Sequence, residues 1–229
     1  MDFAISALRL TKPVTFAAAV LALAGTLCAR AGELAVTVVD RLGRPVPEVV
    51  ITLVPLQPWA ARTSKAPPPS AVMDQRNLAF APRVLAIAVG TKVEFPNNDS
   101  VSHQVYSFSA AKRFQLPLYK GEAHPPVQFD REGLVVLGCN IHDQMAGYIY
   151  VTAAPWFGTT GADGMLRLGG VAAGEYRIEA WSPLIADPPG TLVRTVRIEA
   201  ERSSDAHVQL TRDLRSRPEP RPRPTDWEY

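Results

Sequence analysis

The chain has 229 residues, of which 47% are hydrophobic and 20% are charged, so it can bury the core of one large or two small domains. Its 24 Lys and Arg and 22 Asp and Glu give a formal net charge of +2, without the basic excess that nucleic-acid binding requires. The 21 prolines and 15 glycines favour short strands joined by turns over helices.

Residues 1–31 have the pattern of a secretory signal peptide. Arg9 and Lys12 come before an apolar run over residues 14–27, and an Ala-x-Ala sequence ends at Ala31. The run is shorter than the about 20 residues that a membrane-spanning helix needs. We therefore expect export to a bacterial-type periplasm, and no stable membrane span after the signal is cleaved.

Cleavage would remove Cys28 and leave Cys139 as the one cysteine of the mature chain. A lone thiol in an exported protein has no disulfide partner within its own chain and is open to oxidation. Metal ligation is a reason for such a residue to be present. The cysteine count thus makes Cys139 a candidate metal ligand.

Apolar alternation predicts strands on both sides of a Pro-rich segment. Residues 33–39 and 49–55 alternate and are joined by a turn, whereas residues 57–70 contain three consecutive prolines and indicate a linker. Further strands are predicted at residues 84–89, 92–95, 133–138, 148–151, 165–171, 176–180, 193–198 and 207–210. The strand at 133–138 is expected to be central and buried on both faces. No stretch after the signal has a sustained helical period, so the predicted fold class is all-β.

The segment from Cys139 to Met145 carries the most chemical information, because it has the spacing C-x2-H-x2-M. A thiolate, the imidazole of His142 and a thioether lie within seven residues of each other, just after a predicted strand. His103, which follows a turn-rich loop, is the candidate for a fourth ligand. Soft sulfur ligands combined with imidazole favour copper, with Met145 as a long axial ligand.

Zinc is disfavoured for this set because its usual ligands are Cys, His and carboxylates, and methionine is a poor one. Of the other histidines, His124 lies in a Pro-containing loop and His207 lies near the last predicted strand. We expect both of these to be exposed and neither to be a ligand.

These residues resemble the cupredoxin family, particularly plastocyanin and amicyanin, over about residues 73–152. The family pattern G-x-x-V-x-aromatic-x-N corresponds to residues 90–97, ahead of His103, and the C-x2-H-x2-M spacing is that of amicyanin. Gln104 and Ile141 depart from the residues usual at their positions. The chain is also similar to exported cupredoxin-like proteins labelled methylamine utilisation proteins.

The resemblance implies a Greek-key β-sandwich that holds one type 1 (blue) copper ion through His103, Cys139, His142 and Met145. It also implies a carrier of single electrons between transient periplasmic redox partners, and not an enzyme. In this interpretation His142 is the ligand nearest the surface. Two alternatives stay open: a periplasmic copper-binding or delivery protein, and a β-sandwich interaction module with a vestigial copper site.

The flanks resemble the two halves of a carboxypeptidase regulatory-like domain, a transthyretin-like sandwich. Residues 36–53 match its opening, and residues 160–178 match its continuation about a hundred residues later. We interpret this as a cupredoxin inserted into a loop of the second sandwich. The strand at 49–54 should then pair within residues 165–210. In the alternative, residues 33–55 simply pair with the cupredoxin sheets, and the strand would pair only with residues 84–151. Three aromatic residues are expected in a core: Trp156, Phe157 and Trp181.

The predicted organisation has five parts. They are the signal peptide (1–31), the discontinuous regulatory-like sandwich (32–56 and 156–212), the Pro-rich linker (57–70), the cupredoxin domain (71–155) and a disordered tail (213–229), with residues 155–159 as the second crossing segment.

Overall fold

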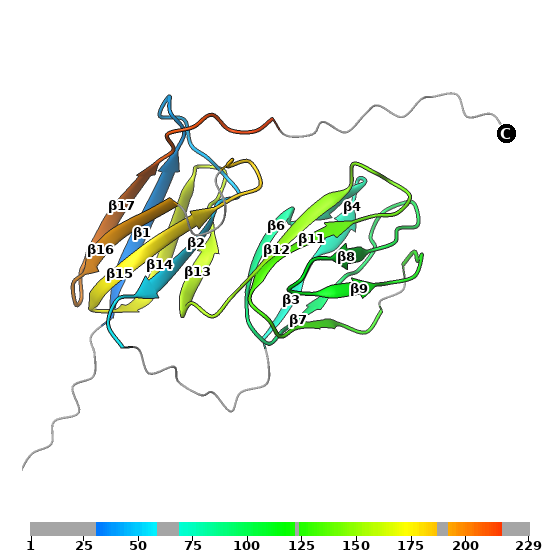
Figure 1. Ribbon diagram of the computed structural model, residues 1–229, viewed down its shortest axis with the longest axis horizontal. Coiled ribbons are helices and arrows are strands. Elements are labelled where there is room, and N and C mark those ends of the chain that lie inside the picture. The colour runs from blue at the N-terminus through cyan, green and yellow to red at the C-terminus, as the bar shows by residue number, and fades with distance from the viewer. Residues whose placement is uncertain (1–30, 59–68, 122–123, 187–191, 217–229) are drawn as a thin grey trace, which may run out of the picture.

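The computed structural model describes residues 31–58, 69–121, 124–186 and 192–216 (Figure 1). Within these ranges the chain forms seventeen strands and no helix, so the predicted all-β class is confirmed. None of the described residues belongs to a helix that is long and apolar enough to cross a membrane. The predicted signal peptide, except Ala31, lies outside the described residues, as do most of the linker and most of the tail.

One β-sandwich, called here the flanking sandwich, is built from the two ends of the described chain. Its first sheet has the order β14-β1-β17, and its second has the order β13-β2-β15-β16. Its strands are β1 (Ala31–Val39), β2 (Val50–Pro55), β13 (Trp156–Thr159), β14 (Met165–Ala172), β15 (Gly174–Trp181), β16 (Leu192–Ile198) and β17 (Ser203–Gln209).

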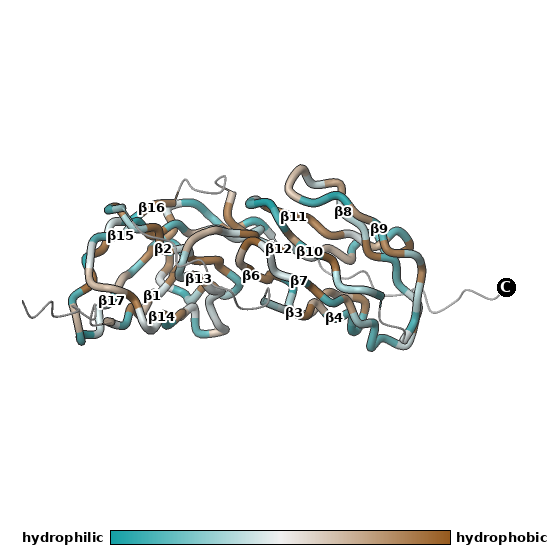
Figure 2. The backbone as a smooth tube through the Cα atoms, turned by 90° about the horizontal axis from the view of Figure 1, so that it is seen from below, coloured by the Kyte–Doolittle hydropathy of each residue, from teal (hydrophilic) through white to brown (hydrophobic). Residues whose placement is uncertain are grey.

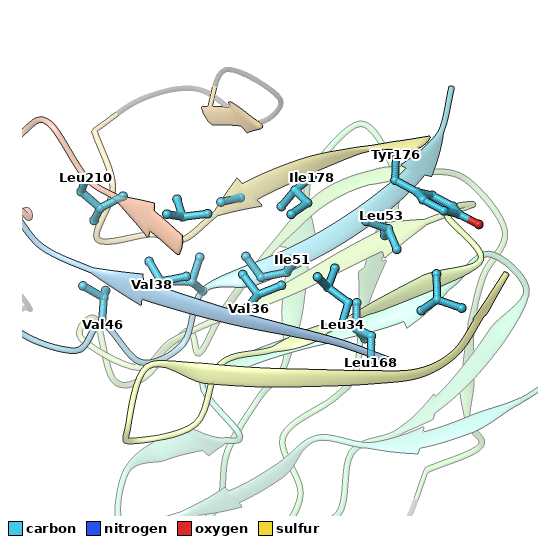
Figure 3. Packing of buried hydrophobic residues seen from close by; sticks show 14 of the residues in the cluster. Leu34, Val36, Val38, Val46, Ile51, Leu53, Leu168, Tyr176, Ile178 and Leu210 are labelled. Atoms are coloured by element: carbon cyan, nitrogen blue, oxygen red, sulfur yellow. The ribbon is translucent and has the colours of Figure 1, made fainter. Parts of the chain in front are cut away.

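Strand β1 is the middle of the first sheet, antiparallel to β14 and parallel to β17. Its alternation turns Leu34, Val36 and Val38 inward, and none of the three has exposed surface. Figure 3 shows these side chains packed with Ile51 and Leu53 of the second sheet. The period-2 pattern of the sequence is therefore what gives the two sheets a shared apolar layer.

Strand β2 connects segments that are far apart in the sequence, because it pairs antiparallel with both β13 and β15. Its Ile51 lies opposite Ala180 in β15. The pairing expected for the strand near residues 49–54 is thus confirmed. That the intervening residues form a domain inserted into this sandwich stays a prediction.

Residues 155–159, expected as a crossing segment, instead include a strand. Trp156–Thr159 form β13 at the edge of the second sheet, opposite Leu53 to Val50. Only four residues take part, and their sequence has no marked alternation, so the pattern that predicts strands is missing. Its partner strand, β2, lies about a hundred residues earlier in the sequence, so the pairing depends on how the chain folds back.

The other sandwich, called here the central sandwich, lies between the two halves of the flanking one in the sequence. Its sheets have the orders β6-β12-β11-β8-β9 and β10-β7-β3, with a small β4-β5 hairpin beside them. Its strands are β3 (Ser70–Val72), β4 (Asp74–Arg76), β5 (Ala79–Ala81), β6 (Val84–Ala88), β7 (Thr91–Glu94), β8 (Tyr106–Phe108), β9 (Arg113–Gln115), β10 (Val127–Phe129), β11 (Gly133–Gly138) and β12 (Ala146–Thr152).

Strand β11 lies between β12 and β8 and is buried on one face only, so the prediction of two buried faces is wrong. Val135 and Leu137 point into the core, whereas Val136 points outward and is 42% exposed. A continuous apolar run cannot show which of its two faces will be covered. Here the cover on the outer face stops partway across the sheet.

The covered part of that outer face is where the two sandwiches meet. Trp181 of β15 is 6% exposed and packs against Tyr148 and Tyr150 of β12, with ring centroids 5.9 and 5.6 Å apart. Val50 and Val84 are buried in the same cluster. Figure 2 shows the sandwiches side by side, with β6 and β13 at the junction. Trp181 was expected in a domain core and not in a seam between domains, and that expectation is wrong, because it lies in the cluster that joins the two sandwiches.

A charged pair adds to the seam. The Arg83 guanidinium donates to the Glu48 carboxylate at 3.0 Å and lies 5.7 Å from the ring centroid of Tyr148. Both charged side chains are largely shielded from solvent. The pair therefore adds a polar contact between the two sandwiches to the apolar contact that Trp181 makes.

The start of the predicted tail contacts the flanking sandwich. Leu214 packs against its core, and the Arg215 backbone N–H donates to the Leu184 carbonyl at 2.7 Å. Residues 213–216 are therefore placed on the sandwich, and the remainder of the predicted tail lies outside the described residues.

Replacing Trp181 with Ala should destabilise the protein by about 3–5 kcal/mol, because the change removes a buried aromatic side chain and leaves a cavity in the seam. Urea unfolding of the mature chain would measure it. Val193→Ala is the matched control, since Val193 is an exposed apolar residue of the same sandwich and should change the unfolding free energy by less than about 0.5 kcal/mol. Equal values for the two variants would show that the seam contributes no stability.

Candidate metal centre

His103 is anchored by its backbone before its side chain is considered. It follows the loop after β7 and forms an antiparallel bridge with Tyr119, in which each backbone N–H donates to the other residue's carbonyl at 3.0 Å. Asn97 secures the loop, because its side-chain amide donates to the carbonyls of Val101 at 3.0 Å and Tyr119 at 2.8 Å. The imidazole, which has no exposed surface, is consequently held in one place.

Asp99 fixes the orientation of that ring. Its carboxylate lies 2.9 Å from Nε2 of His103 and accepts hydrogen bonds from the backbone N–H groups of Leu78 and Ser100, both at 2.7 Å. Burial by itself would raise the pKa of Asp99, but these hydrogen bonds outweigh it and lower the pKa to about 2. Because an ionised carboxylate only accepts, Nε2 must carry the proton, and Nδ1 of a neutral ring then presents its lone pair.

The second part of the site is the loop between β11 and β12. Cys139 directly follows the last residue of β11, and β12 begins at Ala146. The loop folds back on itself, since the Met145 backbone N–H donates to the His142 carbonyl at 2.9 Å. A turn of this length brings residues three apart to the same end of the sheet. The C-x2-H-x2-M spacing is therefore realised as a compact loop.

Gly138, which precedes the cysteine, is required for close packing. A Cβ atom at this position would come within 2.7 Å of the Tyr106 ring, which lies across the strand from it. Any larger residue would displace the tyrosine or the strand that leads into Cys139. The aromatic ring thus covers the backbone next to the thiol.

Three of the four predicted ligands converge. Nδ1 of His103 lies 3.1 Å from Nδ1 of His142, and the Cys139 sulfur lies 3.8 Å and 3.5 Å from these two nitrogens. His103 and Cys139 are buried, whereas His142 is partly exposed. Met145 is 2% exposed and packs in the same apolar cluster as Cys139. Its part as a fourth ligand stays a prediction.

The three converging atoms fit one metal ion. Protein ligands lie about 2.0–2.3 Å from a bound transition metal, so two atoms on the same ion are ~3–4 Å apart, as these are. All the potential ligand atoms of the three residues lie within 4.8 Å of one another. A thiolate and two imidazoles form a set that suits copper or zinc, and a neighbouring thioether favours copper.

A buried polar network supports the site on the side of Tyr119. The tyrosine hydroxyl donates to the Phe95 carbonyl and accepts from the Gln75 side-chain amide, both at 2.5 Å. Burial, together with the nearby Asp74 and Cys139, raises the pKa of Tyr119 to about 12 against the opposing effect of Gln75. The phenol therefore stays neutral and rigidly placed behind the backbone that anchors His103.

The two remaining histidines lie apart from the cluster. His207 is exposed on β17, as expected. His124 is only partly exposed, and its ring packs edge-on against Tyr119 with centroids 4.5 Å apart. The expectation of an exposed His124 is wrong because a Pro-containing loop folds back over an aromatic ring, a long-range contact that composition does not reveal.

Sequence reasoning missed two residues that shape the site. Asp99 lies four residues before His103 in a turn-rich loop, and that spacing was the available signal. Tyr119 gave no signal, since it is joined to His103 only by a backbone bridge across an irregular segment.

No protein-family model matches this sequence, and no curated protein matches it. Solved structures do. A purple cupredoxin from Nitrosopumilus maritimus is 26% identical, with a TM-score of 0.32, over 37% of this chain and 99% of that one. A reduced amicyanin mutant is 23% identical, with a TM-score of 0.33, over 44% of this chain and 98% of that one. A copper-containing nitrite reductase from Thermus scotoductus is 27% identical, with a TM-score of 0.36, over 50% of this chain and 28% of that one.

Proposed function

We propose that this protein binds one copper ion through His103, Cys139, His142 and Met145 and carries single electrons between partner proteins. The observation that carries the proposal is the convergence of a buried thiol and two imidazole nitrogens at separations of 3.1–3.8 Å. Copper bound there would supply a one-electron couple, tuned by the Met145 thioether and by the surroundings of the Cys139 sulfur.

Rigidity favours electron carriage over catalysis. His103 is held by its backbone bridge and by Asp99, and the other three residues lie on one short loop between paired strands. A metal ion held in fixed geometry changes redox state with little rearrangement. Four protein ligands would also leave no open position for a substrate, which a catalytic metal site needs. Electrons would pass through His142, the partly exposed member of the set.

The same burial disfavours copper delivery. A delivery protein must pass its ion to an acceptor, so its ligands should be reachable from outside. Here His103 has no exposed surface and Cys139 is 3% exposed. Release would therefore require the loop to open. Export to the periplasm, proposed from residues 1–31, would place the carrier among exported redox proteins.

The visible spectrum of residues 32–229 with added Cu(II) tests the ligand set. A thiolate bound to Cu(II) should give an intense blue or green charge-transfer band, and Cys139→Ser should abolish it because the sulfur is lost. His207→Ala is the control, since this exposed histidine lies on the flanking sandwich and should leave the band unchanged. A folded but colourless protein would instead favour an interaction module with a vestigial site.

Asp99 should set copper affinity without touching the ion. Asp99→Ala removes the acceptor that fixes the His103 tautomer and should weaken copper binding about 10- to 100-fold. Asp99→Asn keeps an acceptor oxygen without the charge, so its copper affinity should lie between those of the unchanged protein and Asp99→Ala. Competition titration with a chelator would measure the affinity, and circular dichroism would check folding. The control is Asp205→Asn on β17, an exposed carboxylate of the other sandwich. Unchanged affinity in a folded Asp99→Ala protein would remove Asp99 from the site.

A further inference from the structure

A cleft opens between the two sandwiches beside the seam. It has a volume of about 640 Å³, and both sandwiches contribute to its lining. Strands β2 and β15 supply one wall, and residues in and next to β11 and β12 supply the other. Junctions between domains, and cavities of this size, are where proteins commonly bind small molecules. The side chains of the two walls therefore indicate what kind of molecule the cleft accepts.

The wall on the flanking sandwich is charged. Strands β2 and β15 turn alternate residues into the core, which leaves Arg177 and Glu179 on the outer face, opposite Val54 and Thr52 of β2. The Arg177 guanidinium donates to the Glu179 carboxylate at 2.8 Å. The two charges balance each other, and the hydrogen bond orients the carboxylate.

The wall on the central sandwich combines a carboxylate with apolar surface. Leu134 of β11 and Tyr150 of β12 lie opposite each other in the sheet and form the apolar part. Glu132 comes just before β11, and its Oε1 accepts a hydrogen bond from the Ala153 backbone N–H at 2.7 Å. That bond ties the carboxylate to the residue after β12 without neutralising its charge.

Tyr150 indicates that the two carboxylates converge. Burial raises the pKa of its phenol, and the negative charges of Glu179 and Glu132 raise it further. Because the interaction between charges falls with distance, one carboxylate from each sandwich must lie near the same ring. The ring is also fixed at the seam, where it packs on Trp181 with centroids 5.6 Å apart. An aromatic surface and two carboxylates therefore share one space.

The lining of the cleft carries a net negative charge. Glu132 and Glu179 are its two acidic residues and Arg177 is its one basic residue, which leaves a net charge of −1. This charge disfavours an anion. A divalent metal ion is also disfavoured, because it needs several oxygen ligands and Arg177 already occupies the Glu179 carboxylate. A monovalent organic cation matches the charge, and its apolar part would match Leu134 and Tyr150.

The positions of the carboxylates favour a planar cation. They lie on opposite walls, so the positive group of the ligand must donate hydrogen bonds in two directions. An amidinium or guanidinium group has donors on several sides of one plane, is weakly hydrated and can lie on an aromatic ring. An ammonium group is a compact, strongly hydrated charge without a flat face.

We propose that this cleft binds a small organic cation that carries an amidinium or guanidinium group. The cationic group lies between Glu132 and Glu179, and the apolar part of the ligand lies on Tyr150 and Leu134. The bound molecule contacts both sandwiches, so it stabilises the junction beside Trp181. The proposal is independent of copper, since the residues that line the cleft do not include the candidate metal ligands.

Benzamidinium is the probe, and amide NMR shifts of residues 32–229 without added metal report its binding. We expect saturable shifts on both walls, at residues 52–55 and 177–179 and at residues 132–134 and 150–154. Benzamide, a neutral molecule of nearly the same shape, is the matched control and should bind about tenfold more weakly, because it has no charge to pair with the carboxylates. Equal binding of the two molecules, or benzamidinium shifts confined to one wall, would overturn the proposal.

Substitutions that change the charge of the cleft should have effects of opposite sign. Glu132→Gln should weaken benzamidinium binding about 5- to 10-fold, because it removes one of the two negative charges. Arg177→Gln should strengthen binding, because it releases the Glu179 carboxylate for the ligand.

Glu33→Gln is the matched control for these variants. The Glu33 carboxylate also accepts from an arginine, Arg167, but it lies on the other sheet of the flanking sandwich, so its loss should leave the affinity unchanged. Circular dichroism would check that each variant folds. Folded Glu132→Gln and Arg177→Gln proteins that bind benzamidinium as tightly as the unchanged protein would show that the cleft is not the binding site.

Discussion

The hydrogen bond between His103 and Asp99 is the interaction on which the candidate site depends. A buried imidazole must satisfy both ring nitrogens, and the 2.9 Å contact with Asp99 commits Nε2 to carrying the proton. Nδ1 is then left as an acceptor that faces the Cys139 thiol and His142. The carboxylate stays ionised because two backbone N–H groups also donate to it. Without that carboxylate, the backbone would still place the ring, but nothing would commit the proton to Nε2 and the lone pair to Nδ1.

Strand β12 connects the candidate site to the rest of the molecule. It starts where the ligand loop ends, its inner face builds the core with Ile149 and Val151, and its outer face presents Tyr148 and Tyr150 to Trp181. One strand therefore borders the ligand loop, the core and the seam. Because interiors are close-packed, a shift at the seam cannot be absorbed within a strand held on both faces. The flanking sandwich thus restrains the element that anchors the second half of the site.

The five-stranded sheet that contains β12 has one face that is only partly covered. Its inner face is largely apolar, with Ser107 as a buried polar residue, but its outer face can be covered only by something other than its own sandwich. The seam cluster extends as far as Leu134 of β11, whereas Val136 on the same strand and Phe108 on β8 are exposed to solvent.

The sequence by itself determined what depends on local pattern. Period-2 alternation gave most of the strands, including β1 and its inward Leu34, Val36 and Val38, and the C-x2-H-x2-M spacing gave the loop that brings Cys139 and His142 together. Only the tertiary structure decided what depends on contacts between distant segments. It placed Asp99 and Tyr119 around His103, turned Trp181 into the seam, left one face of β11 half open and paired β13 with β2. The reason is physical: a periodic pattern records that a face is apolar, but what covers that face is set by chain folded back from elsewhere.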